Sequence, residues 1–206
     1  MRMQILIVIL VSAAVISSCR KGNNPPENII SEFPNEVGNH WHYLYTTTQS
    51  NTIDVDIVGT RILPGGQTAK VWAYKYNFSI YPMRTDTSYV VVDSQLVKIY
   101  KLYYGSYYER MRYKLPVTVG DMWTLSPPDS YKDTTWVLGK YPVTVPAGTF
   151  ETYELKKERG YIVNSWTNNK IWFSPKVGVI KFEQSEYSLG PVLGNGLWEL
   201  IDYTVH

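Results

Sequence analysis

The chain has 206 residues, and its 20 basic and 18 acidic side chains leave a formal net charge of only +2 at pH 7. That balance argues against a nucleic-acid-binding protein, which carries a concentrated basic face, and the length allows one domain or two small ones. Aromatic residues make up 15% of the chain, which favours strands and raises the question of an aromatic binding surface.

The first predicted element is a signal peptide in residues 1–18. Arg2 precedes an apolar run in residues 5–11 and small residues at 12–14, which is the layout of a secretory signal. The uncharged stretch 3–18 is shorter than the roughly 20 apolar residues that a membrane span needs. We therefore expect residues 1–18 to be cleaved from the mature protein.

The signal ends in residues 16–19, Ile-Ser-Ser-Cys, which resemble the bacterial lipobox. Cys19, the single cysteine of the chain, is predicted to carry the lipid that anchors the protein to a membrane. The alternative is an incidental cysteine near the end of an ordinary signal. Residues 20–26 are polar and contain Pro and Gly, as expected of a flexible tether. We place this tether at residues 19–32, with a short helix candidate at 27–32.

The residue after the cysteine is Arg20, and not the aspartate that retains many lipoproteins in the inner membrane. The tether also lacks the acidic cluster that resembles a surface-export signal in Bacteroidota lipoproteins. The prediction is an outer-membrane anchor that faces the periplasm.

An internal repeat organises the rest of the chain. Residues 33–41 match residues 115–123, 82 positions later (115 minus 33), and Pro and Gly residues recur at the same offset in the turns at 64–66 and 146–148. Chance recurrence of Pro and Gly is the alternative. The repeat predicts a single β domain over 33–206, with related halves at about 33–114 and 115–206. Each half is under 100 residues, so we expect one joint core.

The secondary structure is predicted to be almost entirely β. Residues 52–57 and 70–76 alternate apolar and polar side chains, and residues 88–92 and 176–182 are rich in β-branched residues. Residues 103–108 suggest a hairpin with Gly105 and Ser106 at a two-residue turn. The predicted fold is an antiparallel curved sheet, a half-barrel or a sandwich built from two related halves, with little helix.

Candidate catalytic and metal-binding residues are few. His40 and His42 share one face of a predicted strand, but a zinc site needs three or four ligands, and the third histidine is the terminal His206. Carboxylates that a glycoside hydrolase would need as a pair occur at five positions: Asp54, Asp56, Glu151, Glu154 and Glu158. The alternative interpretation is that these five carboxylates lie on strand faces exposed to solvent. We therefore predict no catalytic residue, no metal and no cofactor, with a carboxylate-based envelope hydrolase as the alternative.

The candidate binding residues are four tyrosines of the predicted hairpin: Tyr103, Tyr104, Tyr107 and Tyr108. Their rings, flanked by basic side chains, could stack on sugars or contact a partner protein. The alternative is a hairpin that packs one face on the core and keeps its hydroxyls at the rim. Five tryptophans are expected in the core or in a pocket wall: Trp41, Trp123, Trp166, Trp172 and Trp198.

Residues 145–151 and 172–181, with the opening 33–41, resemble a signature of uncharacterised periplasmic lipoproteins of Bacteroidota. That family has no established activity. Its distant fold analogy is to LolA/LolB-like lipoprotein carriers, in which a curved antiparallel sheet surrounds a hydrophobic cavity, although this chain lacks their plug helices. The lipobox, the aromatic content and the missing catalytic residues favour a non-enzymatic, membrane-tethered binding or accessory domain. Its expected partner is a hydrophobic ligand, a glycan or an envelope protein. A structural envelope component is a third hypothesis.

Overall fold

The computed structural model describes residues 33–48, 50–79, 81–93, 95–126, 133–161, 165–187 and 195–206. The predicted signal peptide, the lipidated Cys19 and the tether with its helix candidate lie outside these ranges. Within them, no helix is long and apolar enough to cross a membrane.

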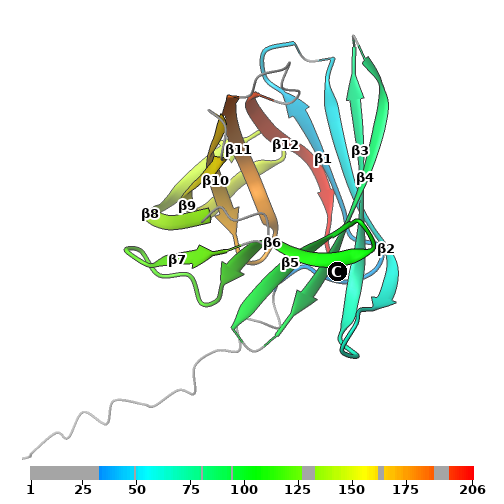
Figure 1. The fold of residues 1–206 in the computed structure, drawn as a ribbon. Coiled ribbons are helices and arrows are strands. Elements are labelled where there is room, and N and C mark those ends of the chain that lie inside the picture. The colour runs from blue at the N-terminus through cyan, green and yellow to red at the C-terminus, as the bar shows by residue number, and fades with distance from the viewer. Residues whose placement is uncertain are drawn as a thin grey trace, which may run out of the picture.

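The described residues form twelve strands, which are joined in antiparallel ladders (Figure 1). They are β1 (His40–Tyr45), β2 (Thr52–Ile62), β3 (Thr68–Phe78), β4 (Tyr81–Val92), β5 (Leu96–Tyr103), β6 (Ser106–Lys114), β7 (Met122–Leu125), β8 (Asp133–Val145), β9 (Gly148–Tyr161), β10 (Ser165–Ser174), β11 (Gly178–Tyr187) and β12 (Gly196–Thr204).

The strands lie in a single sheet with the order β6-β5-β4-β3-β2-β1-β12-β11-β10-β9-β8-β7. Each half of the chain is thus a six-stranded meander, and the halves join where β1 pairs with β12, with Trp41 opposite Tyr203. The sheet curves into a nearly closed barrel (Figure 1). The predicted antiparallel β class is confirmed, and between the two expected architectures the structure is a curved sheet and not a sandwich.

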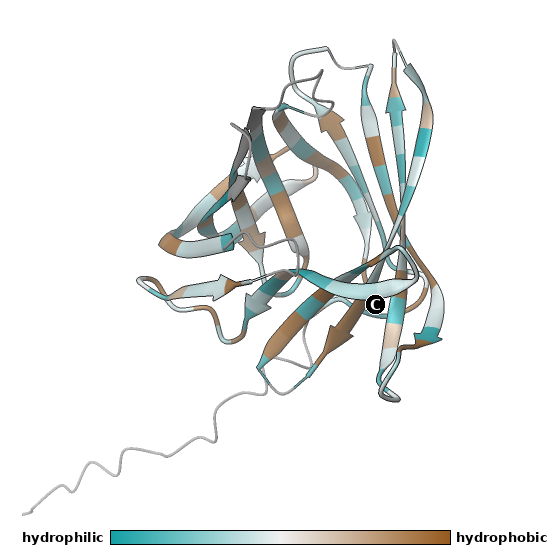
Figure 2. Cartoon of the chain, in the orientation of Figure 1, coloured by the Kyte–Doolittle hydropathy of each residue, from teal (hydrophilic) through white to brown (hydrophobic). Residues whose placement is uncertain are grey.

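Alternation of side chains explains why these segments form strands with one buried face. In β2, the β-branched residues Ile53, Val55 and Ile57 are buried, and the residues between them face outward. Figure 2 shows the same alternation of apolar and polar residues along most strands. Burying one face of a two-sided strand fixes its register, because a slip by one residue would expose the whole apolar set.

The two halves open with the same hydrogen bonds. The Gly38 amide donates to the Ile57 carbonyl at 2.9 Å, and the Gly120 amide donates to the Val137 carbonyl at 2.9 Å. Both glycines have positive φ, 97° and 90°, which a residue with a Cβ rarely adopts. The next strand has a bulge after Ile57 in one half and after Val137 in the other. The duplication itself stays a prediction, and the matching contacts define which positions of the halves correspond.

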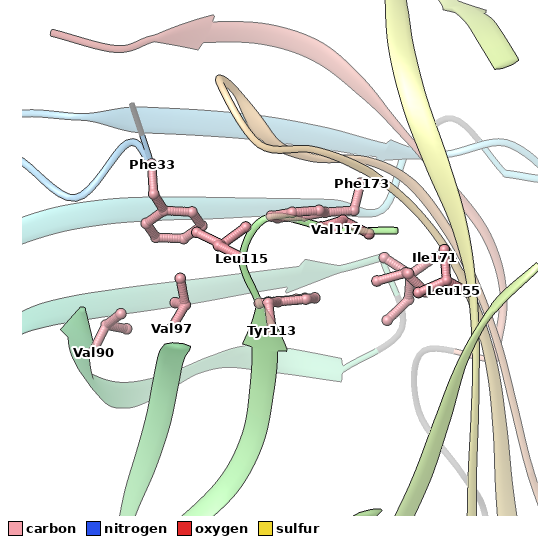
Figure 3. Close-up of a cluster of buried hydrophobic side chains, with 10 residues drawn as sticks. Phe33, Val90, Val97, Tyr113, Leu115, Val117, Leu155, Ile171 and Phe173 are labelled. Carbon is pink, nitrogen blue, oxygen red and sulfur yellow. The ribbon is translucent and has the colours of Figure 1, made fainter. Parts of the chain in front are cut away.

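One hydrophobic cluster contains residues of both halves (Figure 3). Tyr113 of β6 stacks on Phe173 of β10, with ring centroids 4.5 Å apart and planes 6° apart. Phe33, just before β1, contacts Phe173 from the other side at 6.2 Å. Because Phe173 is fully buried, it lies at the centre of this cluster and ties the first half to the second.

The sheet does not close by a ladder: among the described residues, β6 and β7 are the unpaired ends of the order. Side chains of the second half instead donate to carbonyls of β6. Trp123 Nε1 donates to Arg112 O at 3.2 Å, while Lys157 Nζ and an Arg159 guanidinium nitrogen both donate to Arg110 O, at 3.3 and 3.2 Å. We call this junction of Arg110, Arg112, Trp123, Lys157 and Arg159 the seam. It holds the barrel nearly closed.

Two local predictions were wrong. The hairpin turn is formed by Tyr104 and Gly105, not by Gly105 and Ser106, because both turn residues have positive φ (47° and 77°), as a two-residue hairpin of this twist requires. Trp172 was expected in the core or a pocket wall. It lies half-buried on the opposite face of β10 from Phe173, and its ring sits between the ammonium groups of Lys170 and Lys181 at 5.6 and 5.5 Å.

Candidate functional site

A cavity of about 810 Å³ lies inside the curved sheet, between the two halves. Strands of both halves line it: β1 to β6 of the first half and β10 to β12 of the second. Its volume is in the range of small-molecule binding pockets, which are about 300–1,000 Å³. Most of its lining residues are aromatic or aliphatic.

Aromatic side chains at every second position of β3 form one wall: Trp72, Tyr74, Tyr76 and Phe78. Neighbouring rings are nearly parallel, with centroids 6.2 Å apart between Tyr74 and Tyr76 and 6.3 Å between Tyr76 and Phe78. Every second residue of a strand faces the same side, so period-two aromatics produce a continuous surface of ring faces and edges. We call this row the aromatic wall.

The floor of the cavity is closed by Phe33, Trp41 and Phe173. Trp41 stacks on Trp72 at 4.9 Å, and Phe33 stacks on Trp72 at 6.3 Å. Gly178 lies against Trp41, since an added Cβ would be at an ordinary contact distance of 3.5 Å from Trp41 Nε1. Its φ of 102° is the feature that favours glycine at this position. The deep end is therefore a dense aromatic cluster.

The polar atoms of Trp41, Trp72 and Tyr43 are hydrogen-bonded to the protein itself. Trp41 Nε1 donates to Val177 O at 2.6 Å, Trp72 Nε1 donates to Asn35 Oδ1 at 2.9 Å, and the Tyr43 hydroxyl donates to Val179 O at 2.8 Å. The rings thus face the cavity while their donors are already satisfied. Such a surface favours apolar groups over polar ones.

The cavity tyrosines stay neutral at physiological pH. Burial raises the pKa of Tyr43 and of Tyr113 well above the usual value, and it raises the pKa of Tyr74 to about 12. Burial also raises the pKa of Tyr76 strongly, with the Arg84 charge opposing the shift. The inner cavity consequently carries no charge from these groups.

Charged and polar side chains gather at one end of the cavity, which we call the mouth: Arg84, Thr85 and Asp86 on β4, and Asn169 and Gln184 on β10 and β11. Asp86 forms an ion pair with Lys101, whose ammonium group also lies 5.0 Å from the Tyr74 ring centroid. Arg84 is exposed, lies opposite Tyr76 in the β3–β4 ladder, and has no ion pair within the described ranges. The mouth therefore has one positive charge in excess.

The mouth adjoins a split in the sheet. β4 and β5 pair only between residues 89–92 and 97–100, although β4 extends back to Tyr81 and β5 continues to Tyr103. In Figure 1, β5 and β6 cross at a steep angle to β3 and β4. The exposed apolar side chains of Met83 (63% exposed) and Leu102 (46%) lie on these diverging segments.

The four hairpin tyrosines predicted to bind a ligand lie outside the cavity lining. Tyr103 and Tyr104 are 62% and 90% exposed at the tip of the β5–β6 hairpin. Tyr107 packs edge-on against Tyr89 at 4.9 Å, on the outer face of the sheet, and Tyr108 is half-buried. The structure thus separates two exposed rings from two packed ones, and their role in binding stays a prediction.

The predicted histidine and carboxylate candidates pair with one another on the outer face. His40 Nδ1 lies 2.7 Å from Asp56 Oδ1, and His42 Nδ1 lies 2.5 Å from Asp54 Oδ1. His206 follows β12 at the end that pairs with His40, and its amide donates to Asn39 Oδ1 at 3.0 Å. Within the described ranges, no group of three His, Cys, Asp or Glu residues is arranged to hold a metal.

The other candidate carboxylates are dispersed along β9. Glu154 pairs with Lys170 at 3.2 Å and accepts a hydrogen bond from Tyr141, and Glu158 pairs with Lys156 at 2.5 Å. Glu151 is exposed. Asp86 is the one carboxylate among the described residues that line the cavity.

Two of the five predicted tryptophans, Trp41 and Trp198, are 1% exposed and line the cavity. Trp123 packs at the seam, and the Trp166 side chain lies outside the described residues. Sequence reasoning missed the aromatic wall. The signal was present in residues 70–76, whose alternation was used to predict a strand but not to ask what its aromatic face would cover.

Two solved structures are similar to this chain in fold. One is a presumed exported protein with a YmcC-like fold from Bacteroides fragilis, with a TM-score of 0.52, 14% identity, and coverage of 84% of this chain and 98% of that one. The other is a presumed lipoprotein from Parabacteroides distasonis, with a TM-score of 0.54, 14% identity, and coverage of 84% and 97%. No family model and no curated protein matches the sequence. At this identity, the likeness shows a shared fold.

Proposed function

We propose that the protein is a non-enzymatic binding protein of the cell envelope, and that it holds a hydrophobic ligand in the cavity between its halves. The observation that carries the proposal is the cavity itself: about 810 Å³, closed at one end by aromatic rings and lined mostly by apolar side chains. Moving an apolar ligand from water to such a surface is favourable in proportion to the area buried. At the closed end, the satisfied donors of Trp41, Trp72 and Tyr43 leave few polar partners for a glycan.

The same geometry favours binding over hydrolysis. Hydrolysis by paired carboxylates needs two carboxyl groups about 5–9.5 Å apart in a cleft, and the described cavity lining offers Asp86 alone, already paired with Lys101. The histidines that a nucleophilic site would recruit, His40 and His42, lie with their aspartate partners on the outer face and do not line the cavity. The positions of these groups support a binding role for the cavity.

We place the protein at a membrane through lipid on Cys19, in the outer membrane facing the periplasm, as the lipobox and the following Arg20 indicate. The exported-protein and lipoprotein descriptions of the two fold neighbours agree with a place in the cell envelope. The resemblance to Bacteroidota lipoproteins and, more distantly, to LolA/LolB-like carriers supports the same compartment. No nucleic acid is expected as a partner. Replacement of Cys19 by Ser should abolish labelling with radioactive palmitate and release the protein from the membrane fraction. Retention of both would contradict the anchor.

The binding role is tested with N-phenyl-1-naphthylamine, a neutral apolar fluorophore. We expect saturable binding of about one probe per chain, with a blue-shifted emission excited by energy transfer from the cavity tryptophans. Val179→Trp, which narrows the cavity at a lining residue, should weaken binding at least tenfold.

The matched control is Val58→Trp, because Val58 is 59% exposed and does not line the cavity. It should bind the probe like the wild type. Circular dichroism spectra and unfolding midpoints of both variants report whether each is folded. If Val179→Trp does not fold, competition of the wild-type signal by unlabelled hexadecan-1-ol replaces it. Absence of saturable probe binding to the wild-type protein would overturn the proposed function.

A further inference from the structure

We propose that the ligand is a single-chain amphiphile with an anionic head, held with its tail in the aromatic cavity and its head at Arg84. This inference rests on the proposed function and adds the chemical class of the ligand. It follows from the uneven distribution of charge along the cavity, which is uncharged at the floor and positive at the mouth.

The direction of the ligand follows from the two ends. The floor is a cluster of buried rings around Trp41 and Phe173, where an ionised head would lose its hydration without gaining a partner, at a large cost. The mouth has water access and polar side chains on both sides, from Arg84 on β4 to Gln184 on β11. A tail directed inward and a head at the mouth satisfy both environments.

The sign of the head follows from the pairing at the mouth. The Asp86 carboxylate is already neutralised by the Lys101 ammonium group, so it offers little to a cationic head. Arg84 has no ion pair within the described ranges and lines the cavity beside the Tyr76 ring. A guanidinium group presents a fork of donors that matches a carboxylate or a phosphate. Charge complementarity therefore selects an anion.

The row of rings suits an extended alkyl chain. Ile171, Val179 and Phe182 of the second half line the same cavity as the aromatic wall. The β4 segment between residues 81 and 88, which pairs with β3 but not with β5, borders the split beside the mouth. An extended alkyl chain can lie along the row from Phe78 to Trp72. The split leaves room for the head to remain in water.

Four amphiphiles with the same sixteen-carbon chain test the inference, each used below its micelle concentration to displace N-phenyl-1-naphthylamine. Hexadecanoate and hexadecyl phosphate carry anionic heads, hexadecan-1-ol is neutral, and hexadecyltrimethylammonium is cationic. We expect both anions to bind more tightly than the alcohol, and the alcohol more tightly than the cation. Comparing the affinities of hexadecanoate and hexadecyl phosphate distinguishes a carboxylate ligand from a phosphate ligand.

Arg84→Gln should weaken hexadecanoate about fivefold, which corresponds to ~1 kcal/mol for an exposed ion pair, and should leave hexadecan-1-ol unchanged. The matched control is Arg61→Gln, an exposed arginine of β2 that does not line the cavity. It should change neither affinity. Raising the salt concentration should reduce the preference for the anion in the wild type, because salt screens exposed charges.

The outcomes separate the two proposals. If none of the four amphiphiles displaces the probe, the proposed function fails. If they bind but the alcohol or the cation binds as tightly as hexadecanoate, or if Arg84→Gln weakens the acid and the alcohol equally, the hydrophobic cavity stands and the anionic-head inference is overturned.

Discussion

Lys157 at the seam is a mostly buried cation, and its burial should make the stability of the fold depend on pH. Its Nζ lies 3.4 Å from Asp133 Oδ2 and donates to Arg110 O at 3.3 Å, and the side chain is only 13% exposed. Burial lowers the pKa of Lys157 to about 8. The Asp133 carboxylate opposes the shift, but it is shared with Arg159, whose own charge lowers the pKa further. The charged lysine therefore destabilises the fold at neutral pH.

The sign of the pH dependence follows from proton binding. An unfolded lysine titrates near pH 10.4, so between about pH 8 and pH 10 the unfolded chain binds more protons than the folded one, and stability rises with pH. The full drop in the pKa corresponds to about 3 kcal/mol, of which roughly 2 kcal/mol falls between pH 7 and pH 9.5. The rise levels off near pH 9.5 and then reverses, because tyrosines ionise in the unfolded chain while burial keeps Tyr43, Tyr74 and Tyr113 protonated in the fold.

Urea unfolding, followed by circular dichroism at pH 7, 8, 9 and 9.5, measures this rise. Lys157→Met should remove it and should increase stability at pH 7 by about 1–2 kcal/mol, since the gain from removing a buried charge exceeds the hydrogen bond lost to Arg110. Lys140→Met, at an exposed position of the neighbouring strand β8, should keep the wild-type profile. A flat wild-type profile, or a rise that persists in Lys157→Met, would refute this reasoning.

Two further predictions concern backbone conformation and use the same unfolding assay. Tyr104→Asn should stabilise the protein by up to about 1 kcal/mol, because Tyr104 has a φ of 47° in the hairpin turn and Asn before Gly suits that turn better than Tyr does; a loss of stability would mean that the exposed ring contributes packing. Gly120→Ala should lower the free energy of unfolding by about 1–2 kcal/mol, because Gly120 has a φ of 90°. The control Gly59→Ala has open space around the new methyl group and should lower it much less. Equal losses of stability would contradict the role assigned to positive φ.

The sequence predicted the strands well because strand formation with one buried face leaves a local mark. The alternation of Ile53, Val55 and Ile57 appears in the sequence and again in the burial of β2. The position of the hairpin turn was less predictable. Tyr at the first position of such a turn is unusual, since the positive φ there favours Gly, Asn or Asp. The residue types therefore predicted a turn at Gly105 and Ser106, one residue beyond the observed turn.

The cavity and the paired histidines depend on information that no single segment contains. The aromatic wall lines a cavity only because the sheet curves far enough to bring β10 and β11 opposite β3. Likewise, the His40–Asp56 and His42–Asp54 contacts depend on the register between β1 and β2, which places those residues directly opposite each other. Sequence spacing identified the residue types but not their partners.

The matched openings of the two halves show how one architecture supports two different interiors. Ile57 corresponds to Val137, because each accepts the same hydrogen bond from a glycine of the opening turn. From this pair we compared the β2–β3 ladder of the first half with the β8–β9 ladder of the second, residue by residue. Tyr74 then corresponds to Lys157, and Tyr76 corresponds to Arg159.

In the first half, these corresponding positions face the cavity with rings. In the second half, they carry the cations that donate to Arg110 and hold β6, with Asp133 at the position of Ile53. The cavity therefore lies against the wall of the first half, and the ion cluster that closes the barrel occupies the equivalent place in the second. Replacing Tyr74 by Lys would place a buried cation in the cavity wall, in addition to Lys157 at the seam. Because burial penalises the charged form, as it does for Lys157, the variant should be less stable near neutral pH. It should also lose part of the apolar surface on which the proposed ligand binding depends.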